Sequence, residues 1–226
     1  MNLVYGEPAV VTGNFDGTGT DDDGNSSNLE TAGMPEGSTA QEFLTQLQED
    51  FTAMAKSVAR YGGFYISRYE IGAGGSSKKG QKVLTADDPD DITEDDNYLG
   101  ANTWYGLYNT IKNSGANKQM IWGCQYDQVI KFLRENGEDP ENGHTYIAPG
   151  RALSGQNEQD KMLNIYDLEG NNCEWTAEAS SYNYRSYRGS SYNHAYRGIF
   201  HPASCLYVLD PSSSTYSDSS RTTLYL

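Results

Sequence analysis

The longest helical pattern in the chain lies between residues 38 and 60. Ser38-Thr-Ala-Gln41 has the form of a capping box, in which the first and last side chains satisfy each other's free backbone N–H groups. Apolar residues then recur at spacings of three and four, which puts them on one face of a helix. These residues are Phe43, Leu44, Leu47, Phe51, Met54, Ala55 and Val58. The pattern predicts an amphipathic helix over 39–60 that ends at Gly62-Gly63.

Shorter apolar patterns follow this helix. Residues 63–72 are rich in aromatic and β-branched side chains, so they predict a core strand, with Arg68 and Glu70 on one face as a candidate ion pair. Two further helices and one short apolar strand are predicted over 102–112, 127–134 and 120–123. The segments that are polar and rich in turn-forming residues are 1–37, 73–98 and 137–160.

The first of these polar segments, 1–37, predicts a short strand followed by a long loop, because apolar periodicity ends at Val11. Its Asp21-Asp-Asp23 run lacks the spacing and the terminal Glu of an EF-hand, so we expect a solvated acidic loop there. The whole chain has a formal net charge of −15, which opposes nucleic-acid binding because that function needs a basic surface. No stretch approaches the roughly 18 consecutive apolar residues of a membrane span.

The last 48 residues, 179–226, differ in composition from the rest of the chain. They contain no Lys, Glu, Gln, Met or Trp, whereas residues 1–178 contain 39 of these. Tyr and Ser are abundant instead, with 8 and 12 occurrences. Antibody-like binding surfaces use this mixture, because Tyr gives rigid contact area and Ser gives adaptable hydrogen bonds. The plainer alternative is a surface of strands and loops that simply dispenses with long charged side chains.

Several spaced motifs between residues 62 and 226 resemble one protein family. They are Tyr65-Ile-Ser-Arg-Tyr-Glu70, Thr103-Trp-Tyr105, Met120-Ile-Trp-Gly-Cys124, Ile165-Tyr-Asp-Leu-Glu-Gly-Asn-Asn-Cys-Glu-Trp-Thr176, Arg188-Gly189, Pro202-Ala-Ser204 and Ser220-Arg221. Together they resemble the formylglycine-generating-enzyme superfamily, and in particular its non-enzymatic branch, which includes variable proteins of diversity-generating retroelements. The resemblance implies one domain over 1–226 with an α+β, C-type lectin-like fold that is rich in loops, with short twisted strands and two or more helices.

In such retroelement systems, adenines of a template are miscopied, so that AAY codons become NNY, and NNY codons cannot encode the five absent residue types. The resemblance therefore implies that 179–226 is a variable ligand-binding region. Framework positions in it would be Arg188, Gly189, Pro202, Ala203, Ser204, Pro211, Ser220, Arg221 and Leu224. The predicted ligand contacts are Tyr182, Tyr184, Tyr187, Ser191, His194, Tyr196, Ile199, Phe200, His201, Cys205, Leu206, Tyr207, Val208 and Asp210. Among them, residues 206–208 are expected to form a partly exposed apolar patch.

The resemblance also implies a calcium site, because the matching positions of the enzyme branch bind structural calcium. These positions are Asp167, Gly170, Asn172 and Glu174. Two carboxylates and the backbone carbonyls of residues 170 and 172 would offer four hard oxygens from one tight turn. The alternative is that the two carboxylates only cap turn amides, and both interpretations stay open.

The residues that make the enzyme branch active do not recur. That branch uses two cysteines five residues apart, and their approximate counterparts are Phe200 and Cys205, so no copper-binding pair is expected. The other cysteines, at 124 and 173, have no metal-ligand spacing, and we expect buried free thiols. The sequence therefore predicts a ligand-binding protein and not an enzyme.

The predicted ligand is a macromolecule, such as a protein or glycan on the surface of a host or neighbouring cell. The protein would act at a phage tail tip or displayed on a bacterial surface, without binding nucleic acid or inserting into a membrane. No signal peptide is expected, because residues 1–7 lack a basic start followed by an apolar run. The alternatives are an oxidase or other enzyme of the formylglycine type, and a structural virion subunit without a ligand.

Overall fold

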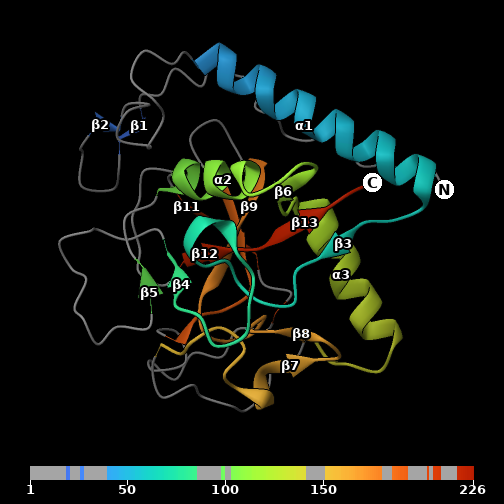
Figure 1. The fold of residues 1–226 in the computed structure, drawn as a ribbon, viewed down its shortest axis with the longest axis vertical. Coiled ribbons are helices and arrows are strands. Elements are labelled where there is room, and N and C mark those ends of the chain that lie inside the picture. The colour runs from blue at the N-terminus through green and yellow to red at the C-terminus, as the bar shows by residue number, and fades with distance from the viewer. Residues whose placement is uncertain are drawn as a thin grey trace.

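The computed structural model shows a mixed helix and sheet architecture (Figure 1). It describes residues 19–20, 26–27, 40–85, 98–99, 103–140, 151–179, 185–192, 203, 206–209 and 218–226. Most of the predicted N-terminal strand and loop lies outside these residues, which include only the short pair β1 (Gly19–Thr20) and β2 (Ser26–Ser27). The assignment of 1–226 to one domain stays a prediction.

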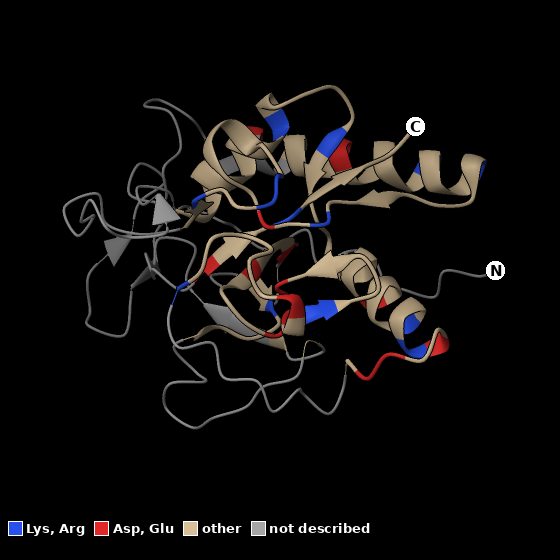
Figure 2. Ribbon diagram, turned by 60° about the horizontal axis from the view of Figure 1, so that its bottom comes forward, with Lys and Arg blue, Asp and Glu red and all other residues tan. Residues whose placement is uncertain are grey.

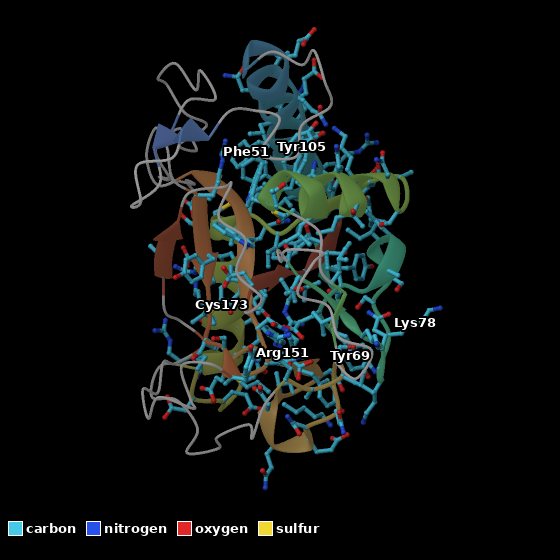
Figure 3. The ribbon with its side chains drawn as sticks, turned by 90° about the vertical axis from the view of Figure 1, so that its left-hand side faces the viewer. Phe51, Tyr69, Lys78, Tyr105, Arg151 and Cys173 are labelled. Atoms are coloured by element: carbon cyan, nitrogen blue, oxygen red, sulfur yellow. The ribbon has the colours of Figure 1, made fainter. Side chains whose placement is uncertain are left out.

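The predicted long helix is confirmed as α1 (Ala40–Tyr61), which crosses the top of the molecule in Figure 1. It ends at Gly62, whose φ of +83° few other residues adopt. Leu47 and Met54 are buried on its inner face, and Phe51 packs against the same core beside α2, where Figure 3 shows it near Tyr105. The apolar spacing in the sequence therefore identified the face that packs.

Two shorter helices complete the described helical part. α2 (Trp104–Asn113) begins after Thr103, whose hydroxyl accepts the Gly106 N–H. α3 (Gly123–Glu135) begins four residues before the predicted start, because the Gln125 side chain accepts the backbone N–H of Trp122 at 3.0 Å and so caps the first turn. Single turns of 3₁₀ helix occur at η1 (Ala73–Gly75) and η3 (Glu158–Asp160).

The main sheet has four strands in the order β11-β10-β9-β12. The strands are β9 (Cys173–Ala179), β10 (Arg185–Arg188), β11 (Leu206–Leu209) and β12 (Asp218–Ser220). β12 runs parallel to β9, whereas β10 pairs antiparallel with both of its neighbours. β9 is therefore an inner strand, and β11 lies at an edge of this sheet.

A second sheet has three strands in the order β3-β13-β6. The strands are β3 (Tyr65–Ile66), β6 (Lys118–Met120) and β13 (Thr222–Leu224). Arg221 alone separates β12 from β13, so it is the residue at which the chain passes from one sheet to the other. Two small pairs complete the described strands: β4 (Val83–Leu84) with β5 (Tyr98–Leu99), and β7 (Lys161–Met162) with β8 (Ile165–Tyr166).

The core lies in two clusters of buried side chains. The first gathers α1, α2, β6 and β9 around Trp104, Trp122 and Trp175. The second joins α3 to residues around β7 and β8, including Tyr126 and Leu168. None of the helices in the described residues is both long enough and apolar enough to cross a membrane. The α+β class predicted from the sequence is confirmed.

The predicted strand over 63–72 is corrected by the structure. Regular pairing ends at Ile66, and the chain bends at residues 68 and 69. Arg68 is exposed, whereas Glu70 is completely buried and accepts hydrogen bonds from the loop at 171–172. The expected Arg68–Glu70 ion pair is wrong, because the bend carries the two side chains into different surroundings.

Candidate ligand-binding face and the buried acidic cluster

Residues 173–177 of β9 form the fixed base of the candidate face. All five are buried, and Trp175 is completely so. The Thr176 hydroxyl donates to the carbonyl of Ser186 at 2.9 Å, and its carbonyl accepts the indole N–H of Trp104 at 2.8 Å. Side-chain bonds thus join β9 to β10 and to α2 in addition to the backbone ladder, which makes this strand hard to displace.

The next strand, β10, also turns most of its side chains inward. Arg185 is buried with its guanidinium 4.6 Å from the centre of the Trp104 ring. Arg188 forms an ion pair with Asp127 and stacks 5.1 Å from the Tyr126 ring centre. Between them, Tyr187 is only half-buried and meets the Trp175 ring edge-on, with centroids 5.4 Å apart. β10 is therefore largely framework.

Gly189, which follows β10, has a positive φ of 79° in a crowded turn. A Cβ atom there would lie 2.6 Å from the carbonyl oxygen of Leu168 and 2.9 Å from Oε2 of Glu174. No other residue fits, so the Arg-Gly pair of the motif has a steric cause.

The predicted ligand contacts divide into described and undescribed residues. Tyr187 is half-buried against the core, and Ser191 is completely buried, so Ser191 offers no area to a ligand in this conformation. Leu206, on the edge strand β11, is 52% exposed as predicted. For Tyr207 and Val208 only the backbone is described. Tyr182, Tyr184, His194, Tyr196, Ile199, Phe200, His201, Cys205 and Asp210 lie outside the described residues.

Beneath this face lies a cluster of four carboxyl groups, which we call the acidic cluster. It consists of Glu70, Asp160, Asp167 and Glu174, none more than 5% exposed. Figure 2 shows acidic residues in the middle of the ribbon as well as at its lower right. Arg221, also completely buried, donates through Nε to Glu174 at 2.8 Å and to the backbone carbonyl of Tyr166. The positive charge of the Arg221 guanidinium therefore faces four buried carboxyl groups.

Burial raises the pKa of each of these acids, because it disfavours the charged form. The pKa of Asp160 rises to about 7, that of Asp167 to about 6 and that of Glu174 to about 8. Glu70, which also faces Asp167 and Glu174, has a pKa well above its usual range. The cluster therefore retains protons at neutral pH unless a cation replaces them. The sequence analysis placed Asp167 and Glu174 in one site but did not include Asp160, Glu70 or Arg221, and the last two lie far from them along the chain.

The predicted calcium ligands meet in this cluster, but not all are available. Oδ2 of Asp167 accepts the Gly155 N–H at 2.6 Å, while its Oδ1 has no hydrogen-bond partner within the described residues, and neither has Oδ1 of Asn172. Glu174 is engaged by Arg221 and by the Tyr126 hydroxyl.

No three His, Cys, Asp or Glu side chains of the described segments are arranged to hold a metal ion. Gly170 is half-exposed, and a Cβ on it would lie 2.4 Å from Oδ2 of Asp160. Glu174 already forms an ion pair with Arg221, which argues against Glu174 as a calcium ligand. Asp167 keeps a carboxylate oxygen without a partner among the described residues, and so does the side-chain amide of Asn172, which was predicted to act through its backbone carbonyl instead. Calcium binding stays a prediction.

Two of the three cysteines lie in the described part of the chain, and both are free thiols. Burial, together with Glu178, raises the pKa of the Cys124 thiol to about 11, and burial raises that of Cys173 well above its usual range. Neither forms the reactive thiolate at neutral pH. Phe200 and Cys205, the approximate counterparts of the enzyme branch's cysteine pair, lie outside the described residues.

No family model and no curated protein matches the sequence. The structure resembles that of the I1 variant of the major tropism determinant, with a TM-score of 0.51 and 14% identity over 73% of this chain and 50% of that one. For its U1 variant the TM-score is 0.49, with 14% identity over 73% and 51% of the two chains. For PvdO from Pseudomonas aeruginosa it is 0.45, with 15% identity over 72% and 80%. This chain spans about half the length of the tropism determinants. The likeness to the I1 variant shows a C-type lectin-like fold.

Proposed function

We propose that this chain is a receptor-recognition protein whose ligand-binding face is built from β11 and the Tyr/Ser-rich stretches within residues 180–218, with β10 as framework. The observation that carries the proposal is the contrast within one sheet. β9 is buried, whereas the edge strand β11 presents Leu206 with 52% of its surface exposed. A rigid base beneath an exposed, Tyr- and Ser-rich surface is the arrangement that recognition surfaces use, because rigidity lowers the entropy lost on binding.

The resemblance in fold supports the same function. The I1 protein is named as a variant of a major tropism determinant. We infer that this chain binds a protein or glycan on a cell surface, from a phage tail or a bacterial surface. We also infer that a retroelement diversifies residues 179–226, which accounts for the five absent residue types.

The distribution of charge is compatible with such a partner and not with nucleic acid. Residues 1–39 contain seven Asp or Glu, residues 86–102 contain another seven, and neither segment contains Lys or Arg. Nucleic-acid binding is driven by released counterions from a basic surface, which these segments oppose.

A cell-binding assay tests the proposal. The full chain carrying a fluorescent label is mixed with a panel of bacterial strains and measured by flow cytometry. We expect saturable binding to some strains, and loss of that binding when Tyr182 and Tyr184 are both replaced by Ser. The matched control replaces Tyr61 and Tyr65, which are 52% and 60% exposed on another part of the molecule. Equal loss in both double variants would count against the proposed face.

The diversification is tested separately by sequencing the flanking DNA. We expect a reverse-transcriptase gene and a near-copy of the 3′ end with AAY codons at the variable positions. Their absence would leave a binding protein with a fixed surface.

A further inference from the structure

Tyr192 stands directly before the stretch that contains the predicted contacts from His194 to His201, and two residues hold it. Its backbone N–H donates to the carbonyl of Asn171 at 3.0 Å. Its hydroxyl accepts a hydrogen bond from Nε of Arg151 at 2.7 Å, and the Arg151 guanidinium lies 5.4 Å from the centre of its ring. The ring is thus fixed at its edge and on its face. Figure 3 labels Arg151 in the lower part of the molecule.

Asn171 is itself held from two sides. Its Nδ2 donates to Oε2 of Glu70 at 2.5 Å, and its Oδ1 accepts the backbone N–H of Ala152 at 2.9 Å. Its φ of +58° is the left-handed conformation that Asn tolerates better than most residues. Because Ala152 follows Arg151 in the chain, these contacts form a closed network that runs from Asn171 through residues 151–152 to Tyr192 and back to Asn171.

The Asn171 end of this network is shielded from water, whereas Arg151 and Tyr192 are partly exposed. Asn171 and Glu70 are 1% and 0% exposed, and Ser190 and Ser191, which lead into Tyr192, are 2% and 0% exposed. Buried hydrogen bonds of this kind are costly to break, because water cannot take over the lost partner. Residues 190–192 are therefore fixed to the same base as β9, although they belong to the Tyr/Ser-rich region.

We propose that Arg151 and Asn171 are positioning residues of the ligand-binding face, and that Tyr192 is a fixed anchor of that face and not an exchangeable contact. The link to binding rests on the function proposed above. Arg151 and Asn171 both lie outside residues 179–226, so residues that do not vary hold the point from which the following contacts extend. A side chain that is already fixed loses less conformational entropy when a ligand binds, which favours association.

Hydrogen exchange on the full chain tests the anchor without any ligand. The variants are Tyr192→Phe, which removes only the hydroxyl, and Arg151→Ala, which also removes the stacked group. The controls are Tyr65→Phe and Arg68→Ala, since both of those residues are exposed elsewhere. We expect the Tyr192 amide to exchange about fivefold faster or more in both anchor variants and to stay unchanged in the controls. Amides of β9 should keep their protection in all four.

Two results would overturn the anchor: an unchanged Tyr192 amide in Arg151→Ala, or equal acceleration throughout β9, which would mean general destabilisation. The positioning role is tested on cells that bind the unmodified chain. Tyr192→Phe should slow association by about threefold or more with less effect on dissociation, because fewer molecules are ready to bind. Faster exchange with unaltered association would refute that role. Absence of any cell binding by the unmodified chain would refute the proposed function while leaving the exchange result intact.

Discussion

β9 and β11 flank the same strand, β10, but differ in burial and in what packs against them. β9 is covered by α2 and by β12, and its residues from Cys173 to Ala177 are all buried. β11 is an edge strand, and its Leu206 is about half exposed. The backbone pairing is of the same kind on both sides of β10, so what surrounds each strand decides its role. Substitutions on the β9 side should therefore change stability, and those on the β11 side should change binding.

The largest effect is expected at Trp175, the most central side chain of the β9 side. It is completely buried and touches Tyr187 across the sheet. Trp175→Ala should lower the free energy of unfolding by about 3–5 kcal/mol, because it leaves a large cavity. Urea unfolding followed by circular dichroism measures the change. A loss under about 1 kcal/mol would mean that β9 is not the base of the fold.

Arg221 tests the same side through charge. Measured at pH 9, above the pKa of about 8 for Glu174, Arg221→Met should cost about 3–5 kcal/mol of stability, because Glu174 would be left buried without its cation. Both side chains of this pair are fully buried. The matched control is Lys131→Met, which breaks the pair with Glu135 whose side chains are 47% and 62% exposed. That change should cost less than about 0.5 kcal/mol. Similar losses in the two variants would contradict the importance of the buried pair.

Calcium should act on the β9 side alone, through Asp167 and Asn172. At 100 times its dissociation constant it would add about 2.7 kcal/mol of stability. The effect should be larger at pH 8 than at pH 5.5, because the cation competes with the protons of the acidic cluster. Melting curves with calcium and with EGTA measure it, and Asp167→Asn should weaken the response. If the calcium and EGTA curves coincide at pH 8 and also at pH 5.5, calcium does not bind, and protons alone neutralise the acidic cluster.

The acidic cluster should also make stability depend on pH in the presence of EGTA. The folded pKa values of about 7 for Asp160, 6 for Asp167 and 8 for Glu174 lie above the ordinary values of 3.8 and 4.5. Groups with raised pKa stabilise the fold fully below their unfolded pKa, and that stabilisation is lost as pH rises through the folded pKa. Stability should therefore fall between about pH 4 and pH 8.

Unfolding in urea at a series of pH values measures the slope. Asp160→Asn should flatten it, because that variant has one carboxyl group fewer to titrate. An exposed acid such as Glu135, changed to Gln, serves as the control and should leave the slope as it is. A stability that rises over this range would mean that the cluster is ionised and balanced by a cation.

The sequence predicted those parts of the molecule that depend on near neighbours. The helix over 39–60 was found at Ala40–Tyr61, because its apolar face is set by residues three and four positions apart. The first turn of α3 was missed, since the cap at Trp122 comes from its neighbour Gln125 and not from the usual Ser, Thr or Asp.

The acidic cluster could not be predicted in the same way. Glu70 bonds a residue 101 positions away, and Glu174 bonds one 47 positions away. Only the folded chain brings these residues together, and alternation within 63–72 even suggested the wrong partner for Glu70. The resemblance put Asp167 and Glu174 in one site, but it did not reveal that Glu174 lies on β9 and forms an ion pair with Arg221. Long-range electrostatic partners are therefore where local patterns lose their predictive value.

The smallest effect on stability is expected at the exposed edge itself. Leu206 and Phe132 are 52% and 53% exposed, the first on β11 and the second on α3. Replacing either by Ser should change stability by no more than about 0.5 kcal/mol, because neither side chain fills the core. Only Leu206→Ser should weaken cell binding, by up to about 2 kcal/mol or thirtyfold if this residue is an anchor of the interface. If Leu206→Ser destabilises the fold as Trp175→Ala does, the two sides of β10 do not differ and β11 belongs to the core.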